Sequence, residues 1–396
     1  MQITTRTRRA AVALASVAMV AATVTACGND DGGTDSDSRE VTIGLVTAFS
    51  GSAAAYGEAE RASLQTAVEY ANKNQLAKID GEPVTFKIKQ YDSAYDPTKA
   101  VTVTRQALDQ DGVRYFEVLG GGIVPAVQPL VNKENALIFA TAAGDDFIGK
   151  DQPKTFHPYY DVREALKSIL DYYLGNGGDK GRLVVMYPDD DLGQSVGPDA
   201  VKIAEDAGFQ AHAELVGRDV TDFAPIMSKI AKKTDVIDFG PLPPSQQAVA
   251  AKQARQLGFE GIFTFSDTLS LDTLLQTASA ADLEGSLAAP ALEFQANLTE
   301  QGKAWTASMK KKTGQVDGWT AVAYDNLLLL ASAINDAQSL DPAKVADALP
   351  KQKVQGILGE VSYGGADRYG IDRALNLPYG VSEVKDGKSV LVTPGS

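Results

Sequence analysis

The chain has 396 residues, of which 44% are apolar and 22% charged, as in globular proteins, and its length suits two or three domains of about 150 residues. A net charge of −14 and the lack of a basic patch exclude a nucleic-acid-binding surface. One cysteine and two isolated histidines, His157 and His212, exclude an internal disulfide and provide no metal-ligand spacing. We therefore expect no metal and no other cofactor.

Residues 1–26 have the layout of an export signal. Three arginines lie in residues 1–9, an apolar run follows over 10–22, and V-T-A-C ends at Cys27. This ending resembles the lipobox of bacterial lipoproteins, which implies a lipidated Cys27 and anchoring on the extracytoplasmic face of the cell membrane. The residues after Cys27 have no apolar periodicity, which predicts a flexible acidic tether over 27–39. A plain signal peptide with a free cysteine is the alternative, and the export route, general secretory or twin-arginine, is left open.

From residue 40 onward, strand and helix patterns alternate. β-branched and apolar runs predict strands at 41–48, 84–92 and 136–142, and helical periodicity predicts helices at 58–74 and 97–111. Such βα units imply parallel sheets with helices on both faces.

A second βα series begins with a helix over 161–178, where Asp161 and Glu164 have the spacing of a capping box. The last part of the chain has a different pattern. It predicts long helices at 299–313 and 318–337, a short helix from Asp341 and, at 381–394, a hairpin with an Asp-Gly turn. Two α/β series followed by helices predict two lobes rather than one large sheet.

One motif suggests an enzyme. G-Q-S-V-G at 193–197 matches G-x-S-x-G, which places a nucleophilic serine, here Ser195, on a strand-to-helix turn. The sequence P-D-D-D-L separates this motif from its strand, and His212 has no well-placed acid before it. A hydrolase is therefore the least favoured function.

Two loops after expected strands suit a small polar ligand. Residues 48–57 combine serine and glycine with Tyr56, and residues 119–125 contain three glycines. Backbone N–H groups at a helix N-terminus bind anions, and glycine lets a ligand approach closely. Tight turns without a ligand are the alternative, but ligands of α/β sheets do bind beyond the carboxyl ends of the strands.

The chain resembles the leucine/isoleucine/valine-binding family of type I periplasmic binding proteins from residue 40 to about 370. The stretches that carry the resemblance are VTIGLVTAFSGSAAAYGEAERASLQTAVEYAN, YDSAYDPTKAV, DFAPIMSKI and AYDNLLLLASAI. It implies two Rossmann-like lobes joined by crossings near 160, 290 and 370. Lobe I would be 40–159 and 291–369, and lobe II would be 160–290 and 370–396.

The resemblance also implies a ligand pocket. Asp267 matches an acid that receives an ammonium group, and Tyr56 and Trp319 match aromatic residues at the cleft. The full implied set is Tyr56, Gly121, Gly122, Thr141, Ala143, Leu192, Phe239, Gly240, Asp267 and Trp319. Core packing for Phe239 and Trp319, and helix capping for Asp267, remain alternatives.

Three positions depart from the family. Glycine or Ile123 replaces the serine that binds a ligand carboxylate, Ala143 replaces a threonine, and Leu192 replaces an aromatic residue. The side-chain hydroxyls for an α-amino acid carboxylate are missing, although backbone N–H groups remain. An amide, urea-like, aromatic or otherwise modified ligand is therefore as compatible as leucine or valine.

We therefore expect a monomeric solute-binding lipoprotein of an ABC importer that is not an enzyme. It would close about its hinges on a small polar ligand and deliver it to the permease and ATPase subunits. A membrane-tethered sensor of the same fold is the alternative.

Overall fold

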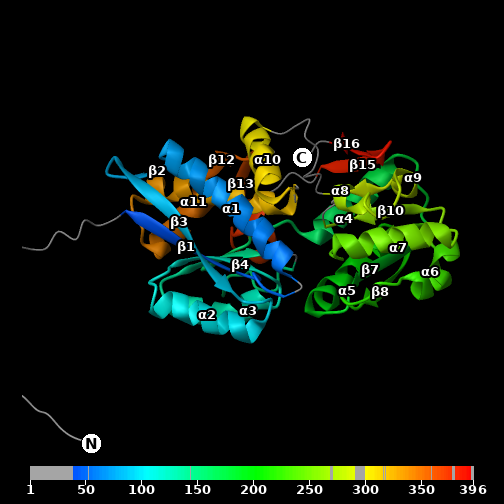
Figure 1. Ribbon diagram of the computed structural model, residues 1–396, viewed down its shortest axis with the longest axis horizontal. Coiled ribbons are helices and arrows are strands. Elements are labelled where there is room, and N and C mark those ends of the chain that lie inside the picture. Colours follow the sequence, from blue (N-terminus) through cyan, green and yellow to red (C-terminus); the bar gives the residue numbers. More distant parts are fainter. Residues whose placement is uncertain are drawn as a thin grey trace, which may run out of the picture. The chain divides into compact units, whose positions relative to one another are not determined.

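The computed structural model describes residues 39–51, 53–142, 144–267, 271–289, 299–314, 316, 318–357, 359–376 and 380–393 (Figure 1). The predicted export signal, Cys27, the tether before residue 39, Ala143 and the crossing expected near residue 290 lie outside these residues. In the described part, no helix is both long and apolar enough to span a membrane.

The sheet of lobe I is parallel except at one edge. Its strands in spatial order are β2 (Ala77–Ile79), β3 (Glu82–Asp92), β1 (Glu40–Thr47), β4 (Tyr115–Leu119), β5 (Leu137–Thr141) and β6 (Thr155–Phe156). Only the β2 and β3 pair within this sheet of described strands is antiparallel. The central strands are apolar along nearly their whole length, as strands buried on both faces must be.

Helices cover both faces of this sheet (Figure 1). One face packs against α1 (Ala54–Asn74), α10 (Glu300–Thr313) and α11 (Ala321–Ala337). The other face packs against α2 (Pro97–Asp109) and α3 (Ile123–Lys133). Lobe I thus combines the first βα series with α10 and α11, which lie more than a hundred residues further along the chain.

The sheet of lobe II has the same layered plan. Its strands in spatial order are β16 (Lys388–Thr393), β15 (Val381–Lys385), β11 (Leu287–Ala288), β10 (Ile262–Phe265), β9 (Val236–Asp238), β7 (Arg182–Pro188) and β8 (Gln210–Val216). One face packs against α4 (Val162–Gly175) and α5 (Asp191–Asp206). The other face packs against helices that include α6 (Ala224–Ile230), α7 (Pro244–Gln256), α8 (Leu271–Leu274) and α9 (Ala280–Leu283).

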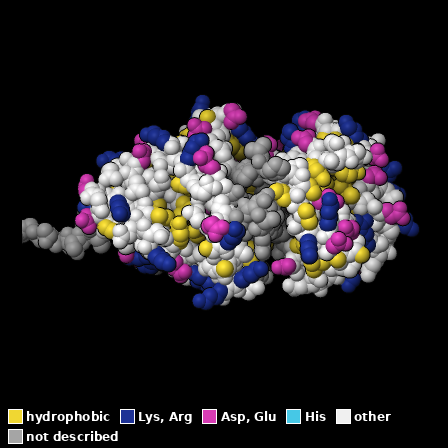
Figure 2. Space-filling view, turned by 90° about the horizontal axis from the view of Figure 1, so that it is seen from above, with side chains coloured by type: hydrophobic (Ala, Val, Ile, Leu, Met, Phe, Trp, Pro, Cys, Tyr) yellow, Lys and Arg dark blue, Asp and Glu magenta, His cyan; other side chains and the backbone are white. Residues whose placement is uncertain are grey.

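The end of the chain contributes to both lobes. After α12 (Pro342–Ala348), the strands β12 (Lys353–Gln355), β13 (Glu360–Gly364) and β14 (Ala374–Asn376) form a small antiparallel sheet, with α13 (Ala366–Tyr369) between the last two. The predicted final hairpin is confirmed, because β15 and β16 are antiparallel and their turn places Asp386 and Gly387 at positive φ. The expected α/β fold, with two lobes of mainly parallel sheet flanked by helices, is confirmed. On the face shown in Figure 2, acidic and basic side chains are interspersed over both lobes.

Candidate ligand-binding site

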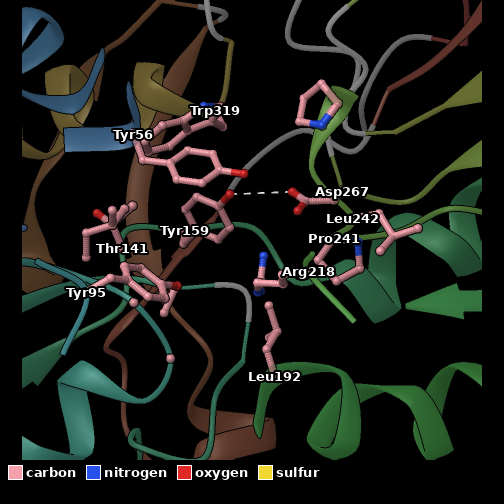
Figure 3. A pocket seen from close by; sticks show the side chains of 15 residues that line it. Tyr56, Tyr95, Thr141, Tyr159, Leu192, Arg218, Pro241, Leu242, Asp267 and Trp319 are labelled. Atoms are coloured by element: carbon pink, nitrogen blue, oxygen red, sulfur yellow. Dashed lines mark hydrogen bonds between the residues drawn. The ribbon is translucent and has the colours of Figure 1, made fainter. Parts of the chain in front are cut away.

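A pocket lies between the two lobes, at the carboxyl ends of their parallel strands (Figure 3). Lobe I and its crossing contribute a largely uncharged wall of Tyr56, Tyr95, Leu119, Gly120, Gly121, Thr141, Ala142, Tyr159 and Trp319. Lobe II contributes a wall with both signs of charge, made by Leu192, Arg218, Pro241, Leu242, Pro244 and Asp267.

Two helix starts bring equivalent residues to the two sides of the pocket. A Cβ added to Gly57 in α1 would lie 2.0 Å from the Ala48 carbonyl oxygen, and one added to Gly193 in α5 would lie 1.8 Å from that of Pro188. Only glycine permits this approach of a helix to the end of its strand. Tyr56 and Leu192, the residues just before these glycines, are thereby placed at the pocket.

Aromatic rings form the lobe I wall. Tyr56 and Trp319 meet edge to face, with ring centroids 6.0 Å apart and an interplanar angle of 71°, an arrangement that aromatic pairs favour. Trp319 lies in a short 3-10 helix, Gly318–Thr320, directly before α11. Tyr56, Trp319 and Tyr159 lie close together on one side of the pocket in Figure 3, opposite Asp267.

Asp267 follows β10 and forms the acidic side of the pocket. Its Oδ1 accepts hydrogen bonds from the Tyr160 hydroxyl and, at 3.4 Å, from the Tyr159 hydroxyl, whose rings stack with centroids 4.1 Å apart. Burial raises the pKa of Asp267 to about 6, although the two tyrosine hydrogen bonds oppose this shift. The carboxylate is therefore mostly ionised at neutral pH and can attract a cationic ligand group.

A second carboxylate lies behind Asp267. Asp238, at the end of β9, accepts hydrogen bonds from Thr264 and Ser266 at 2.7 Å each and from Tyr187 at 3.0 Å. Ser266 directly precedes Asp267, so this fully buried network fixes the backbone from which Asp267 projects.

Arg218 lies opposite the lobe I wall, on the loop after β8. Its Nε donates to Asp190 Oδ2 at 2.5 Å, and Asp190 Oδ1 accepts from the backbone N–H of Gly193 at 3.1 Å, which makes Asp190 the N-cap of α5. The arginine is therefore held by the start of the helix that also carries Leu192.

Thr141 lines the pocket at the end of β5, and its hydroxyl is hydrogen-bonded at 2.8 Å to Glu117 of β4, which is 1% exposed. Asn326 of α11 donates to the other Glu117 oxygen at 3.1 Å. Burial raises the pKa of Glu117 to about 8. Thr141 thus connects the pocket to a buried acid of lobe I.

The sequence pattern of the periplasmic binding protein family matches residues 40–388. The chain belongs to this family. The resemblance seen in the sequence is therefore confirmed, and the solute-binding proteins of the family are not enzymes.

Individual relatives match over most of the chain. This protein is 26% identical to Leu/Ile/Val-binding protein homolog 3 of Brucella melitensis over 82% of this chain and 87% of that protein. The crystal structure of a leucine-binding protein from Thermotoga maritima superposes with a TM-score of 0.75 at 20% identity, covering 90% of this chain and 99% of that one. A solute-binding protein from R. palustris in complex with 4-hydroxybenzoate superposes with a TM-score of 0.73 at 20% identity, covering 90% and 96%.

The fold of this protein brings six of the predicted residues together at the pocket: Tyr56, Gly121, Thr141, Leu192, Asp267 and Trp319. Gly122, Phe239 and Gly240 are not among the lining residues. Phe239 is fully buried and packs against Phe263 and Phe265, with ring centroids 5.3 and 5.6 Å apart. A Cβ on Gly240 would lie 2.0 Å from the Tyr187 ring. The contribution of all ten residues to ligand binding remains a prediction.

Tyr95, Tyr159 and Arg218 also line the pocket, although they are not among the predicted residues. Tyr95 lies within a stretch that carries the family resemblance, and Arg218 lies in a loop after a strand, so chain position gave a signal for both. No motif marked Tyr159, which lies just before the first expected crossing.

Ser195 has none of the geometry of a catalytic serine. It lies inside α5 rather than on a strand-to-helix turn, and its hydroxyl donates to Asp146 at 2.7 Å. His212 is exposed on β8, where it lies 3.7 Å from Glu214. Within the described ranges, no three acidic, histidine or cysteine side chains are grouped as a metal site.

Proposed function

We propose that this protein is the extracytoplasmic solute-binding lipoprotein of an ABC importer, and that it captures a small amino acid, amide or related solute in the pocket between its lobes. The observation that carries the proposal is the lining of one pocket by both lobes. A ligand that contacts both lobes favours the closed form, because only contacts specific to that form shift the equilibrium. The closed form would then deliver the solute to the permease.

Relatives support an organic acid or amino acid as the solute. The Brucella protein is named for leucine, isoleucine and valine, and the R. palustris structure holds 4-hydroxybenzoate. In this pocket, Asp267 suits an ammonium group and the Tyr56 and Trp319 rings suit an apolar body.

The proposal predicts saturable binding that depends on Asp267. Because Trp305 and Trp319 are the two tryptophans, a Trp305→Phe background leaves Trp319 in the pocket as the reporter. Titration with amino acids, their amides and aromatic acids should identify a solute that changes the fluorescence of Trp319. Asp267→Ala should lower the affinity for that solute about tenfold or more, because it removes a desolvated charge partner.

Asp272→Ala is the matched control, because Asp272 is exposed on α8, five residues further along the chain. It should bind the solute as tightly as the unmodified protein. If the Asp267 and Asp272 variants bind equally well, Asp267 does not contribute to solute binding. Cells lacking the protein should lose uptake of the solute, and the Asp267→Ala form should not restore it.

Membrane anchoring is proposed from the sequence around Cys27. In the native bacterial host, the unmodified protein should be found in the membrane fraction with an acylated N-terminal cysteine, detected by mass spectrometry. Cys27→Ser should release it to the soluble extracytoplasmic fraction, because the acyl chains supply the membrane affinity. An unmodified Cys27 in the membrane fraction would contradict the lipoprotein assignment.

A further inference from the structure

We infer that Arg218 binds an anionic group of the solute, so that the ligand is a carboxylate-bearing compound whose carboxylate is received by lobe II. This inference rests on the proposed function and specifies the chemistry of the same pocket. The family resemblance assigned ligand carboxylates to a lobe I loop, where this chain has glycines.

The orientation of Arg218 is fixed, while most of its donors are left for a ligand. Its Nε is paired with Asp190, whose second oxygen is committed to the backbone N–H of Gly193. In the described part of the chain, no acceptor is hydrogen-bonded to Nη1 or Nη2 of Arg218. Figure 3 shows the side chain projecting from the lobe II side into the pocket. A guanidinium presented in this way can form a two-point contact with a carboxylate.

The described lining of lobe I has no charged side chain for an anion. Its lining side chains are uncharged, and the hydroxyl of Thr141 is already hydrogen-bonded to Glu117. The loop at Gly120 and Gly121 offers only backbone N–H groups, which carry no full charge. Among the described residues that line the pocket, Arg218 is the single cation.

The cost of closing the pocket also favours an anion at Arg218. When the lobes enclose a ligand, water is removed from the guanidinium, and an unpaired desolvated charge is costly. Asp190 compensates for it only through Nε. Asp267, on the same lobe, offers the opposite charge to a second ligand group, so a zwitterion can pair with both charges of the lobe II wall.

Matched acid and amide probes test this inference. The unmodified protein is titrated with L-leucine and L-leucinamide, and with 4-hydroxybenzoate and 4-hydroxybenzamide, by calorimetry. At least one acid should bind about tenfold more tightly than its amide, because a charge-assisted contact is lost in the amide. Arg218→Gln should abolish this preference, because it should lower the affinity for the acid and change the affinity for the amide by less than about threefold.

Arg182→Gln is the control, because Arg182 is exposed at the start of β7, at the opposite end of that strand from the pocket. It removes the same charge from lobe II and should keep the preference for the acid. The inference is overturned if Arg218→Gln weakens acid and amide equally, or if only amides bind, in which case the solute-binding function stands. If none of the four probes binds, the inference is overturned, and the proposed amino acid or aromatic acid ligand loses its support as well.

Discussion

Replacing Arg163 by methionine is expected to lower the free energy of unfolding by about 3 kcal/mol at neutral pH. The Arg163 guanidinium forms ion pairs with Asp145 at 2.5 Å, with Asp161 at 2.9 Å and with Asp199 at 2.9 Å. The Arg163, Asp145 and Asp161 side chains are 11%, 11% and 7% exposed. Among the described residues, Arg368 would then be the one cation paired with these two nearly buried carboxylates.

Lys167→Met on the same helix is the matched control. Lys167 pairs with Asp171 at 2.7 Å, but both side chains are more than half exposed, so this change should cost less than about 1 kcal/mol. Both variants are compared by chemical denaturation. Equal losses for the two variants would show that the cluster around Arg163 is no stronger than a surface pair.

The stability of the protein at low pH provides a second test of the ion pairs of Arg163. Burial alone would raise the pKa of Asp145, but its contacts with Arg163 and Arg368 hold this pKa below the ordinary value. This contribution is present above the ordinary pKa and is lost as pH falls through the folded-state pKa. Without Arg163 the pKa of Asp145 should rise, so the stability difference between variant and unmodified protein should shrink as the pH falls below the ordinary aspartate pKa of about 4.

The alternation of strands and helices could be predicted from the sequence because each element has a local cause. The β-branched run at 41–48 corresponds to β1 at Glu40–Thr47, and the helix predicted at 97–111 corresponds to α2 at Pro97–Asp109, which starts after the Asp96 cap. The predicted capping box was only half right. Asp161 caps α4 by accepting from the Arg163 N–H, whereas Glu164 lies 3.5 Å from Arg368.

Strand order could not be predicted, because it depends on contacts between distant parts of the chain. β11 pairs with β15 almost a hundred residues later, and β1 lies between β3 and β4. Local periodicity records which faces of a strand are buried and not which strand is its neighbour.

The pocket was predictable as a set of loops rather than as a set of side chains. The family resemblance implied Thr141 and Asp267, and the rule that ligands bind beyond the carboxyl ends of strands located the loop that carries Tyr56. It cannot say which way a side chain points within a loop. Phe239 directly follows β9 and turns into the core, whereas Arg218 directs a charge into the pocket.

Two buried acids of lobe I, Glu60 and Glu117, should make the stability of the protein depend on pH. Glu60 of α1 is fully buried, and in the described part of the chain neither carboxyl oxygen has a hydrogen-bond partner, although the Thr47 and Thr141 hydroxyls lie near. Burial raises the pKa of Glu60 well above its ordinary value, and Glu117 raises it further. Two neighbouring acids of this kind titrate as a pair.

Glu60→Gln is expected to make the protein more stable than the unmodified form by about 3 kcal/mol near pH 8, and to leave it nearly unchanged near pH 5. In the folded state, Glu60 and Glu117 retain protons that the unfolded chain releases above about pH 4.5. Stability must therefore fall as pH rises from that value toward about 8, where Glu117 titrates. The variant replaces one of these acids by a neutral amide of the same size. Asp238, Asp267 and Asp325 have raised pKa values of about 6, 6 and 7, so part of the slope should remain.

Thermal and chemical unfolding between about pH 5 and about pH 8 measure this difference. Glu58→Gln, two residues earlier on the same helix, is the control: its side chain is 52% exposed and paired with Arg61, so its effect should be small and independent of pH. A Glu60→Gln protein with the same pH slope as the unmodified form would mean that Glu60 is not kept protonated by burial. A reduced slope would show that lobe I keeps protonated acids behind Thr141, within one hydrogen bond of the pocket wall.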